Sequence, residues 1–221
     1  MTDRPADTTM MTIVHDALRR DLARLQAAVA VPGNPRRVAL AGHAAALMRF
    51  LHSHHDNEDL GLWPMVRAAD PGAAGVLDEM DAEHAVVLPL VDGVVTAAPG
   101  YGAAEDGRAG LLAALDALAG PLLAHLRHEE DAALPVVSAA ITDRQWHDWE
   151  HAANVTGRPM AELGLEGHFL LDGLDPARAR VLLHQVPAPV RLVLVRGFAG
   201  RYRRECAARW GPDVPVGPLP R

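Results

Sequence analysis

The two halves of the chain contain the same ordered set of three residues, two histidines and a glutamate. In each half a single histidine is followed, about forty residues later, by a His-x-x-x-Glu motif, and a proline stands six residues after the glutamate. The six residues are His15, His54 and Glu58 in the first half and His84, His125 and Glu129 in the second. Imidazole nitrogens and carboxylate oxygens are both metal ligands, so the two halves together predict one metal centre.

The spacing within each motif suits a helix. Residues four apart lie on one helix face, about 6 Å from each other, so an imidazole and a carboxylate can converge on one point. A single motif of this kind occurs by chance on many helices, whereas two matched copies are a much more specific signal. Glu130 is an alternative to Glu129, but Glu129 repeats the four-residue spacing between His54 and Glu58. Glu129 also lies only about 40° from His125 around the helix, whereas Glu130 lies about 140° from it.

Hydrophobic periodicity predicts that helices position all of these residues. Apolar residues recur at intervals of three and four in four segments, which are separated by Pro, Gly and Asn. The first segment contains His15 to Val29, the second runs from Pro35 to Asp70, the third from about Ala74 to Ala98 and the fourth from about Ala104 to Ala140. Long helices with short turns and an apolar face predict an all-α protein, an up-down-up-down four-helix bundle with a C-terminal helical extension.

The predicted organisation has four parts. A flexible N-terminus (1–9) precedes the bundle (10–140), and a helical C-terminal extension (141–210) and a Pro-rich tail (211–221) follow it. Within the extension, Thr142 and Gln145 form a capping-box signature, and Asp175-Pro176 begins another helix. The Arg-rich segment 189–211 reads either as a helix packed on the bundle, which we favour, or as a basic surface for an anionic partner.

Composition limits the classes of function. The 221 residues are 49% hydrophobic and carry a net charge of −7, which indicates a soluble globular protein and argues against a nucleic-acid partner. We find no signal peptide and no uninterrupted run of eighteen apolar residues. We therefore expect cytoplasmic localisation and no membrane partner. Cys206 is the single cysteine, so no intrachain disulfide can form. A homo-oligomer is compatible with the sequence.

The motif order over about residues 10–140 resembles the bacterial branch of the hemerythrin-like His-His-Glu (HHE) cation-binding domains. The resemblance implies a four-helix bundle that holds two non-heme iron ions bridged by an oxo or hydroxo group. It implies nitrogen ligands at His15, His54, His84 and His125 and bridging carboxylates at Glu58 and Glu129. Manganese and zinc are alternative metals, because spacing does not choose among ions that accept these donors.

The sequence departs from the oxygen-carrying hemerythrins, whose third helix resembles a His-x-x-x-His unit. Here Leu88 stands four residues after His84. Four histidines, two bridging carboxylates and an oxo bridge would leave open about two of the roughly twelve positions of two six-coordinate irons. This count favours redox chemistry with hydrogen peroxide or nitric oxide over transport of dioxygen, provided that no further ligand is present. The candidates for such a ligand are His55, His128, Glu130 and Tyr101.

Three functions follow from this interpretation. The first is a catalase-like or NO-reactive oxidoreductase in oxidative or nitrosative stress defence. The second is a non-catalytic sensor of O2, NO or iron, or an iron-binding protein, that signals through the extension. The third is a structural metal site, which would most simply hold zinc. Whether the protein is an enzyme stays open at this point.

The remaining histidines receive structural interpretations. We expect His43 to be a hydrogen-bonded core residue, and we expect His52, His55 and His128 to lie on other helix faces, exposed or orienting a ligand. His147 and His151 have the spacing of a metal pair but lack partners, so we expect no second site there. The acidic residues that would orient ligand histidines are Asp16, Asp59, Asp81, Glu83 and Asp116.

Overall fold

The computed structural model describes residues 4–186 and 188–212. Within these residues the regular structure is helical, apart from one isolated antiparallel bridge between Pro5 and Thr142. The all-α class predicted from the sequence is therefore confirmed.

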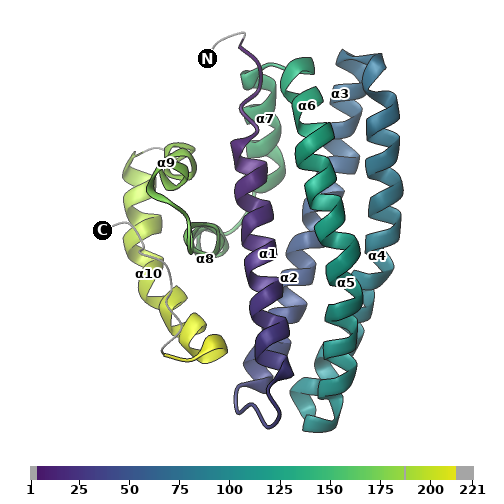
Figure 1. Cartoon of the computed structure of the whole chain (residues 1–221). Helices are drawn as coiled ribbons and strands as arrows, with labels where there is room; N and C mark the ends of the chain where they lie inside the picture. The colour runs from purple at the N-terminus through teal and green to yellow at the C-terminus, as the bar shows by residue number, and fades with distance from the viewer. Residues whose placement is uncertain (1–3, 187, 213–221) are drawn as a thin grey trace.

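Four long helical columns lie side by side and enclose the main core (Figure 1). The columns are α1 (Thr9–Ala30); α2 (Arg37–Asn57), continued by α3 (Trp63–Ala69); α4 (Ala74–Ala103), preceded by a short 3₁₀ turn (Pro71–Ala73); and α5 (Arg108–His128), continued by α6 (Leu134–Ala140). Helices α2 and α5 each contact both α1 and α4. The apolar stripes of all four columns therefore face one another, as a helical period requires.

Two predicted helix ends are wrong. Helix α4 does not stop at Ala98 but continues through Pro99 to Ala103. A proline inside a helix costs about 3 kcal/mol, but Tyr101 is fully buried in the main core, and its burial offsets this cost. The next column begins at Arg108 instead of Ala104, because a 3₁₀ turn (Glu105–Gly107) precedes it. A Cβ on Gly107 would lie 2.4 Å from the backbone of Tyr101, so this connection requires glycine.

Two columns change from α-helical to π-helical geometry at a candidate ligand. The π turns are Glu58–Leu62 and Glu129–Ala133. In each turn the N–H of the residue after the turn donates to the carbonyl of the glutamate, five residues back. Pro64 and Pro135 follow at once, and in a regular α-helix their rings would clash with the carbonyl four residues earlier. The wider turn relieves this clash, so the helix continues past each proline.

The extension consists of α7 (Asp143–Asn154), α8 (Met160–Leu171), α9 (Pro176–His184) and α10 (Ala188–Trp210). Helices α8 and α9 contact α1, and α10 contacts α8 and α2 (Figure 1). The predicted capping box of Thr142 and Gln145 is confirmed, as is the helix that begins at Asp175-Pro176. The Arg-rich segment forms α10 and packs on the bundle.

The described part of the N-terminal segment contacts the start of the extension. Ala6 N–H lies within hydrogen-bonding distance of the carbonyls of Ser138 and Ile141, and Arg4 pairs with Asp143 at 2.9 Å. Residues 1–3, and residues 213–221 of the predicted Pro-rich tail, lie outside the described residues.

Within residues 4–186 and 188–212, two helical stretches are long and apolar enough to cross a membrane, judged by length and composition alone. They are Pro71–Ala103 and Glu105–Ala140, and each forms a column of the bundle. Core helices of soluble proteins pass the same test, so the finding is weak. The expectation of no membrane partner stays a prediction.

Candidate metal centre

The structure brings all six predicted ligand residues together in the interior of the bundle. They form two adjoining groups, and a seventh residue joins the second. The first group consists of His15, His54, Glu58 and Glu129, and the second of His84, His125 and His55. Within each group, one ligand atom of every residue lies within 4.8 Å of the others. Every column of the bundle contributes, so the centre requires the assembled fold.

In the first group, two imidazoles and two carboxylates converge. His15 Nε2 lies 3.3 Å from His54 Nε2 and 3.2 Å from Glu129 Oε2. His54 Nε2 lies 3.1 Å from Glu58 Oε1, the contact that the spacing of the first motif predicts. These distances place four donor atoms around one point.

In the second group, His84 Nε2 lies 3.1 Å from His125 Nε2. Glu58 Oε2 lies 3.6 Å from His84 Nε2, and Glu129 Oε2 lies 3.8 Å from His125 Nε2. Each glutamate therefore approaches one histidine of each group. This is the position that a carboxylate shared by two cations would occupy.

His55 is one of four candidates for a further ligand, although the sequence predicts that it lies on another helix face, exposed or orienting a ligand; the structure places it in the second group. Its ring is buried and stacks on His84, with centroids 4.1 Å apart and planes 12° apart. Its Nε2 is buried without a hydrogen-bond partner. Residues 54 and 55 point about 100° apart around α2. His54 meets α1 and His55 meets α4, because the centre spans the space between these two columns. No spacing rule marks His55 in the sequence.

The two glutamates are buried without the hydrogen bonds that buried carboxylates ordinarily make. Glu58 and Glu129 are both 0% exposed, and none of their four oxygens has a hydrogen-bond partner. Although His15 lies close to Glu129, the pair does not meet hydrogen-bond geometry. Burying an uncompensated carboxylate costs several kcal/mol. The centre therefore fits a bound cation, which would satisfy these oxygens and the free nitrogen of His55.

Acidic side chains hold the outer nitrogens of three candidate ligands. The pairs are His15 Nδ1 with Glu130 (2.9 Å), His84 Nδ1 with Asp59 (2.7 Å) and His125 Nδ1 with Glu83 (2.9 Å). A histidine that donates from Nδ1 presents the lone pair of Nε2 on the opposite side of the ring. The Nε2 atoms of all three histidines therefore face the other candidate ligands of the centre.

Asp59 and Glu83 are therefore confirmed among the predicted orienting residues. The other three predicted residues contact different side chains: Asp16 pairs with Arg19, Asp81 with Arg67 and Asp116 with Gln26. Glu130, considered in the sequence as a ligand, instead contacts His15 and Arg19. Its position agrees with the preference for Glu129 in the centre.

Burial and neighbouring charges shift the protonation of the metal-free centre. Burial lowers the pKa of His54 to about 3. Burial opposes protonation of His15, but Glu129 and Glu130 outweigh it and raise the pKa of His15 to about 9. Burial, and then the charge of Glu129, raise the pKa of Glu58 well above its usual value. An incoming cation would therefore displace protons from this centre.

Other predicted residues lie away from the centre. His43 Nε2–H donates to Asp21 at 2.8 Å and the side chain is buried, so its interpretation as a core residue is confirmed. His128 contacts Glu83, and Tyr101 lies in the apolar core. Among the described residues, neither of the candidate metal groups contains His147 or His151.

Helix α7 supports the π turn that carries Glu58. The indole N–H of Trp149 donates to the carbonyl of Asn57, the residue before the turn, at 3.2 Å. A Cβ on Gly61 would lie 2.7 Å from the Trp149 Nε1, so only glycine permits this close approach. The extension therefore contacts the backbone of the metal centre directly.

Comparison with protein families gives one finding. The model of the hemerythrin HHE cation binding domain matches residues 7–137, which cover more than half of the chain and include all seven residues of the centre. No curated protein and no solved structure matches the chain.

Proposed function

The chain belongs to the hemerythrin HHE cation-binding family, and from this premise we propose that its centre holds two non-heme iron ions. One observation carries the proposal: two fully buried carboxylates without hydrogen-bond partners lie between two groups of imidazoles. We also propose that the four columns are connected up-down-up-down, which would place a ligand-bearing segment of each at one level of the bundle.

The proposed ligand set divides between two ions. His15 and His54 would hold the first ion, and His84, His125 and His55 the second. Glu58 and Glu129 would bridge the two, because each approaches one histidine of each group. Mixed imidazole and carboxylate donors suit iron, with manganese and zinc as alternatives.

Bound iron would supply changes of oxidation state and a position for a small oxidant: hydrogen peroxide, nitric oxide or dioxygen. The protein would keep three imidazoles in the required tautomer through Glu130, Asp59 and Glu83, and would hold the centre away from bulk water. We propose that the protein binds or reacts with such an oxidant in oxidative or nitrosative stress defence in the cytoplasm.

His55 changes the expected balance between turnover and binding. With five histidines, two bridging carboxylates and an oxo or hydroxo bridge, about one of roughly twelve positions stays open, instead of about two. The ligand count then no longer favours peroxide over dioxygen. A second candidate is therefore a non-catalytic O2, NO or iron sensor. The contact of Trp149 with the π turn of Glu58 supports it, because it joins the extension to the centre.

The test begins with metal content. Protein purified anaerobically with iron is expected to contain two irons per chain, and Glu58→Ala is expected to lose both. His55→Ala is expected to weaken the second site, whereas His52→Ala, an exposed histidine of the same helix, is the matched control. Hydrogen peroxide is then added while oxygen release and the near-ultraviolet absorption of an oxo-bridged ferric pair are followed.

Each outcome separates the candidates. Sustained oxygen release that Glu58→Ala abolishes would support an oxidoreductase. Two irons that are oxidised once without turnover would support sensing or binding. One zinc per chain without iron would overturn the di-iron proposal.

A further inference from the structure

A hollow of about 250 Å³ lies between α2 and α4, beside the second group of histidines. Its outer end includes the side chains of His52 and Asp56, which are 51% and 52% exposed. Its inner end is formed by His55 and His84, which are 7% and 5% exposed. The hollow therefore connects solvent with two proposed ligands of the second ion.

The lining of this hollow is acidic. Asp56, Asp59 and Asp81 contribute carboxylates, and no arginine is among the described residues that line it. Only part of this charge is neutralised. Asp81 pairs with Arg67 at 2.6 Å, but the same guanidinium nitrogen is shared with Asp78 at 2.8 Å. Carboxylates around a narrow opening concentrate cations and repel anions.

The inner end offers a nitrogen that has no partner in the protein. His55 Nε2 is buried and unbonded, and the side chain lines the inner end of the hollow. A neutral imidazole is a good ligand for divalent transition metals. Carboxylates at the opening followed by imidazoles inside give a cation successive ligands on a path towards Glu58.

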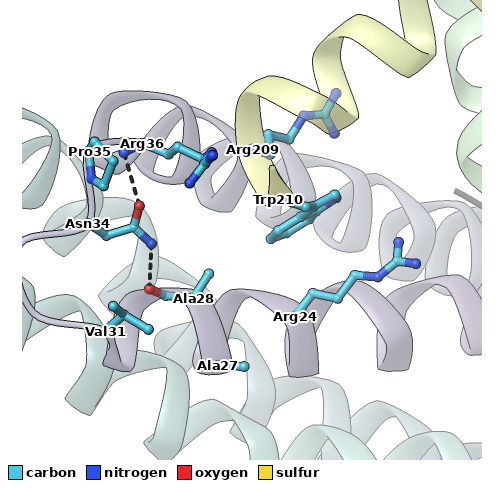
Figure 2. Close-up of a pocket in the computed structure, with 9 residues that line it drawn as sticks. All are labelled: Arg24, Ala27, Ala28, Val31, Asn34, Pro35, Arg36, Arg209 and Trp210. Atoms are coloured by element: carbon cyan, nitrogen blue, oxygen red, sulfur yellow. Dashed lines mark hydrogen bonds between the residues drawn. The ribbon is translucent and has the colours of Figure 1, made fainter. Parts of the chain in front are cut away.

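A second hollow has the opposite character. It measures about 430 Å³ and lies where the connection between α1 and α2 meets the end of α10. Figure 2 shows that Arg24, Arg36 and Arg209 extend around it, with Trp210 between them. Three guanidinium groups would disfavour a divalent cation. Of the two hollows, only the one between α2 and α4 has both the charge and the donors that a cation requires.

We propose that the hollow between α2 and α4 is the route by which divalent metal cations, and ferrous iron above all, reach the centre. Asp56 and Asp81 bind the cation transiently at the opening, and His55 is the first buried ligand that it meets. The proposal rests on the proposed function, because it presupposes that the centre binds metal.

The test measures the rate of metal uptake by the metal-free, full-length protein. Cobalt(II) is the probe, since its visible absorption reports binding without oxidation, and uptake is followed by stopped flow under anaerobic conditions. The double variant Asp56→Asn/Asp81→Asn is expected to take up cobalt about tenfold more slowly at low ionic strength. The difference is expected to shrink at high salt, where surface charges are screened. The final cobalt content is expected to remain two per chain.

Asp78→Asn is the matched control. Asp78 and Asp81 bind the same nitrogen of Arg67, but only Asp81 lines the hollow, so the control removes a charge and an Arg67 contact without changing the route. Its uptake rate is expected to stay within about twofold of the wild type, because Asp78 does not line the hollow and offers no ligand to a cation that passes through it.

A second variant tests the route without changing charge. Leu88 lines the hollow and is partly exposed, so Leu88→Trp would fill the opening. It is expected to slow uptake equally at low and high salt. Uptake at the wild-type rate in both the double variant and Leu88→Trp, with two cobalt ions bound, would overturn the route and leave the metal centre intact. A wild-type protein that takes up neither cobalt nor iron would overturn the proposed function itself.

Discussion

The metal centre and the contact between bundle and extension both bury carboxylates beside imidazoles, but they satisfy them differently. We call the second region the bundle–extension cluster; its residues are Asp21, His43, Arg20, Arg24, Asp172, Tyr202 and Arg209. In this cluster the buried Asp21 and Asp172 meet basic or hydroxyl groups of the protein. In the metal centre, no oxygen of Glu58 or Glu129 meets hydrogen-bond geometry, and the one charged neighbour is His15, 3.2 Å from Glu129.

The bundle–extension cluster joins α1, α2, α10 and the C-terminal end of α8 by short contacts. Asp21 lies 2.8 Å from both His43 Nε2 and Arg20 Nε. Asp172 accepts from Arg24 at 2.6 Å and from Tyr202 at 3.2 Å. Arg209 of α10 donates to His43 Nδ1 at 2.9 Å, which leaves Nε2–H to donate to Asp21. The protein therefore supplies the cations that these two aspartates require.

The difference teaches how to separate a structural buried acid from a ligand. Both regions contain buried carboxylates beside imidazoles, so neither that chemistry nor burial alone identifies function. The distinguishing property is whether the chain itself provides the opposite charge. Asp21 and Asp172 face cations of the chain and hold helices together, whereas Glu58 faces none. Glu129 faces only His15, whose proton a bound metal would displace.

Metal should have the largest effect on stability, and it should act through one region only. At a thousandfold excess over its dissociation constant, each ion stabilises the fold by about 4 kcal/mol, or about 8 kcal/mol for two. Thermal unfolding of metal-free and iron-loaded protein measures this difference. Asp21→Asn should retain the full increase on loading, whereas an increase that disappears in Asp21→Asn would show that the two regions are not independent.

Asp21→Asn should have the next largest effect. Removing one member of a buried charged network costs about 3 kcal/mol, because Arg20 and His43 lose the charge that they face. Chemical denaturation should show this loss equally with and without iron, and the iron content should stay at two per chain. Asp116→Asn, whose carboxylate contacts Gln26 at the surface, is the control and should change stability little.

Glu58→Gln should change the stability of the metal-free protein in the opposite direction. Replacing a buried carboxylate that has no partner removes its desolvation cost, so the metal-free variant should gain about 1–2 kcal/mol at pH 7. The same variant should bind iron poorly. Glu130→Gln should instead destabilise the metal-free protein, since Glu130 contacts His15 and Arg19. A metal-free Glu58→Gln protein less stable than the wild type would contradict the comparison.

The smallest effects should appear as opposite pH dependences. Burial opposes ionisation of Asp21, but His43 and Arg20 lower its pKa to about 2, below the unfolded value of about 3.9. Its contribution is therefore present above pH 4 and is lost as the pH falls towards 2. Glu58 has a raised pKa, so its penalty is absent at low pH and grows as the pH rises above about 4.3.

Unfolding measured from pH 3 to pH 8 should show both trends. The stability advantage of wild type over Asp21→Asn should decrease towards acid. The disadvantage of the metal-free wild type relative to Glu58→Gln should increase towards neutral pH. Parallel trends for the two pairs would remove the distinction between the regions.

Much of the fold was predictable because its signals are local. The apolar period located the four columns, and the repeated motif identified the six residues that now lie together. The sequence predicts that α4 ends at Ala98, because Pro99-Gly100 is an ordinary stop signal. The helix continues to Ala103 because the neighbouring columns bury Tyr101. Local sequence propensity carries no information about this packing between columns.

The parts that could not be predicted depend on distances between helices. His55 reaches the centre only because α4 brings His84 to stacking distance from its ring. The sequence predicts that His43 is a core residue. It does not predict the contact of His43 with Arg209, because these residues are 166 positions apart. Sequence spacing along one helix carries no information about either contact.

The π turns also determine which mutations the chain can tolerate. Each turn contains one residue more than an α-helical turn closed by the same carbonyl, and that residue widens the helix where the ring of the following proline would otherwise clash. Deleting one residue between Glu58 and Pro64 would leave an α-helical turn closed by the same carbonyl and would restore the clash of the proline ring with the carbonyl four residues earlier. These segments should therefore tolerate no change of length, so insertions and deletions in the family should be rare between the glutamate and the proline.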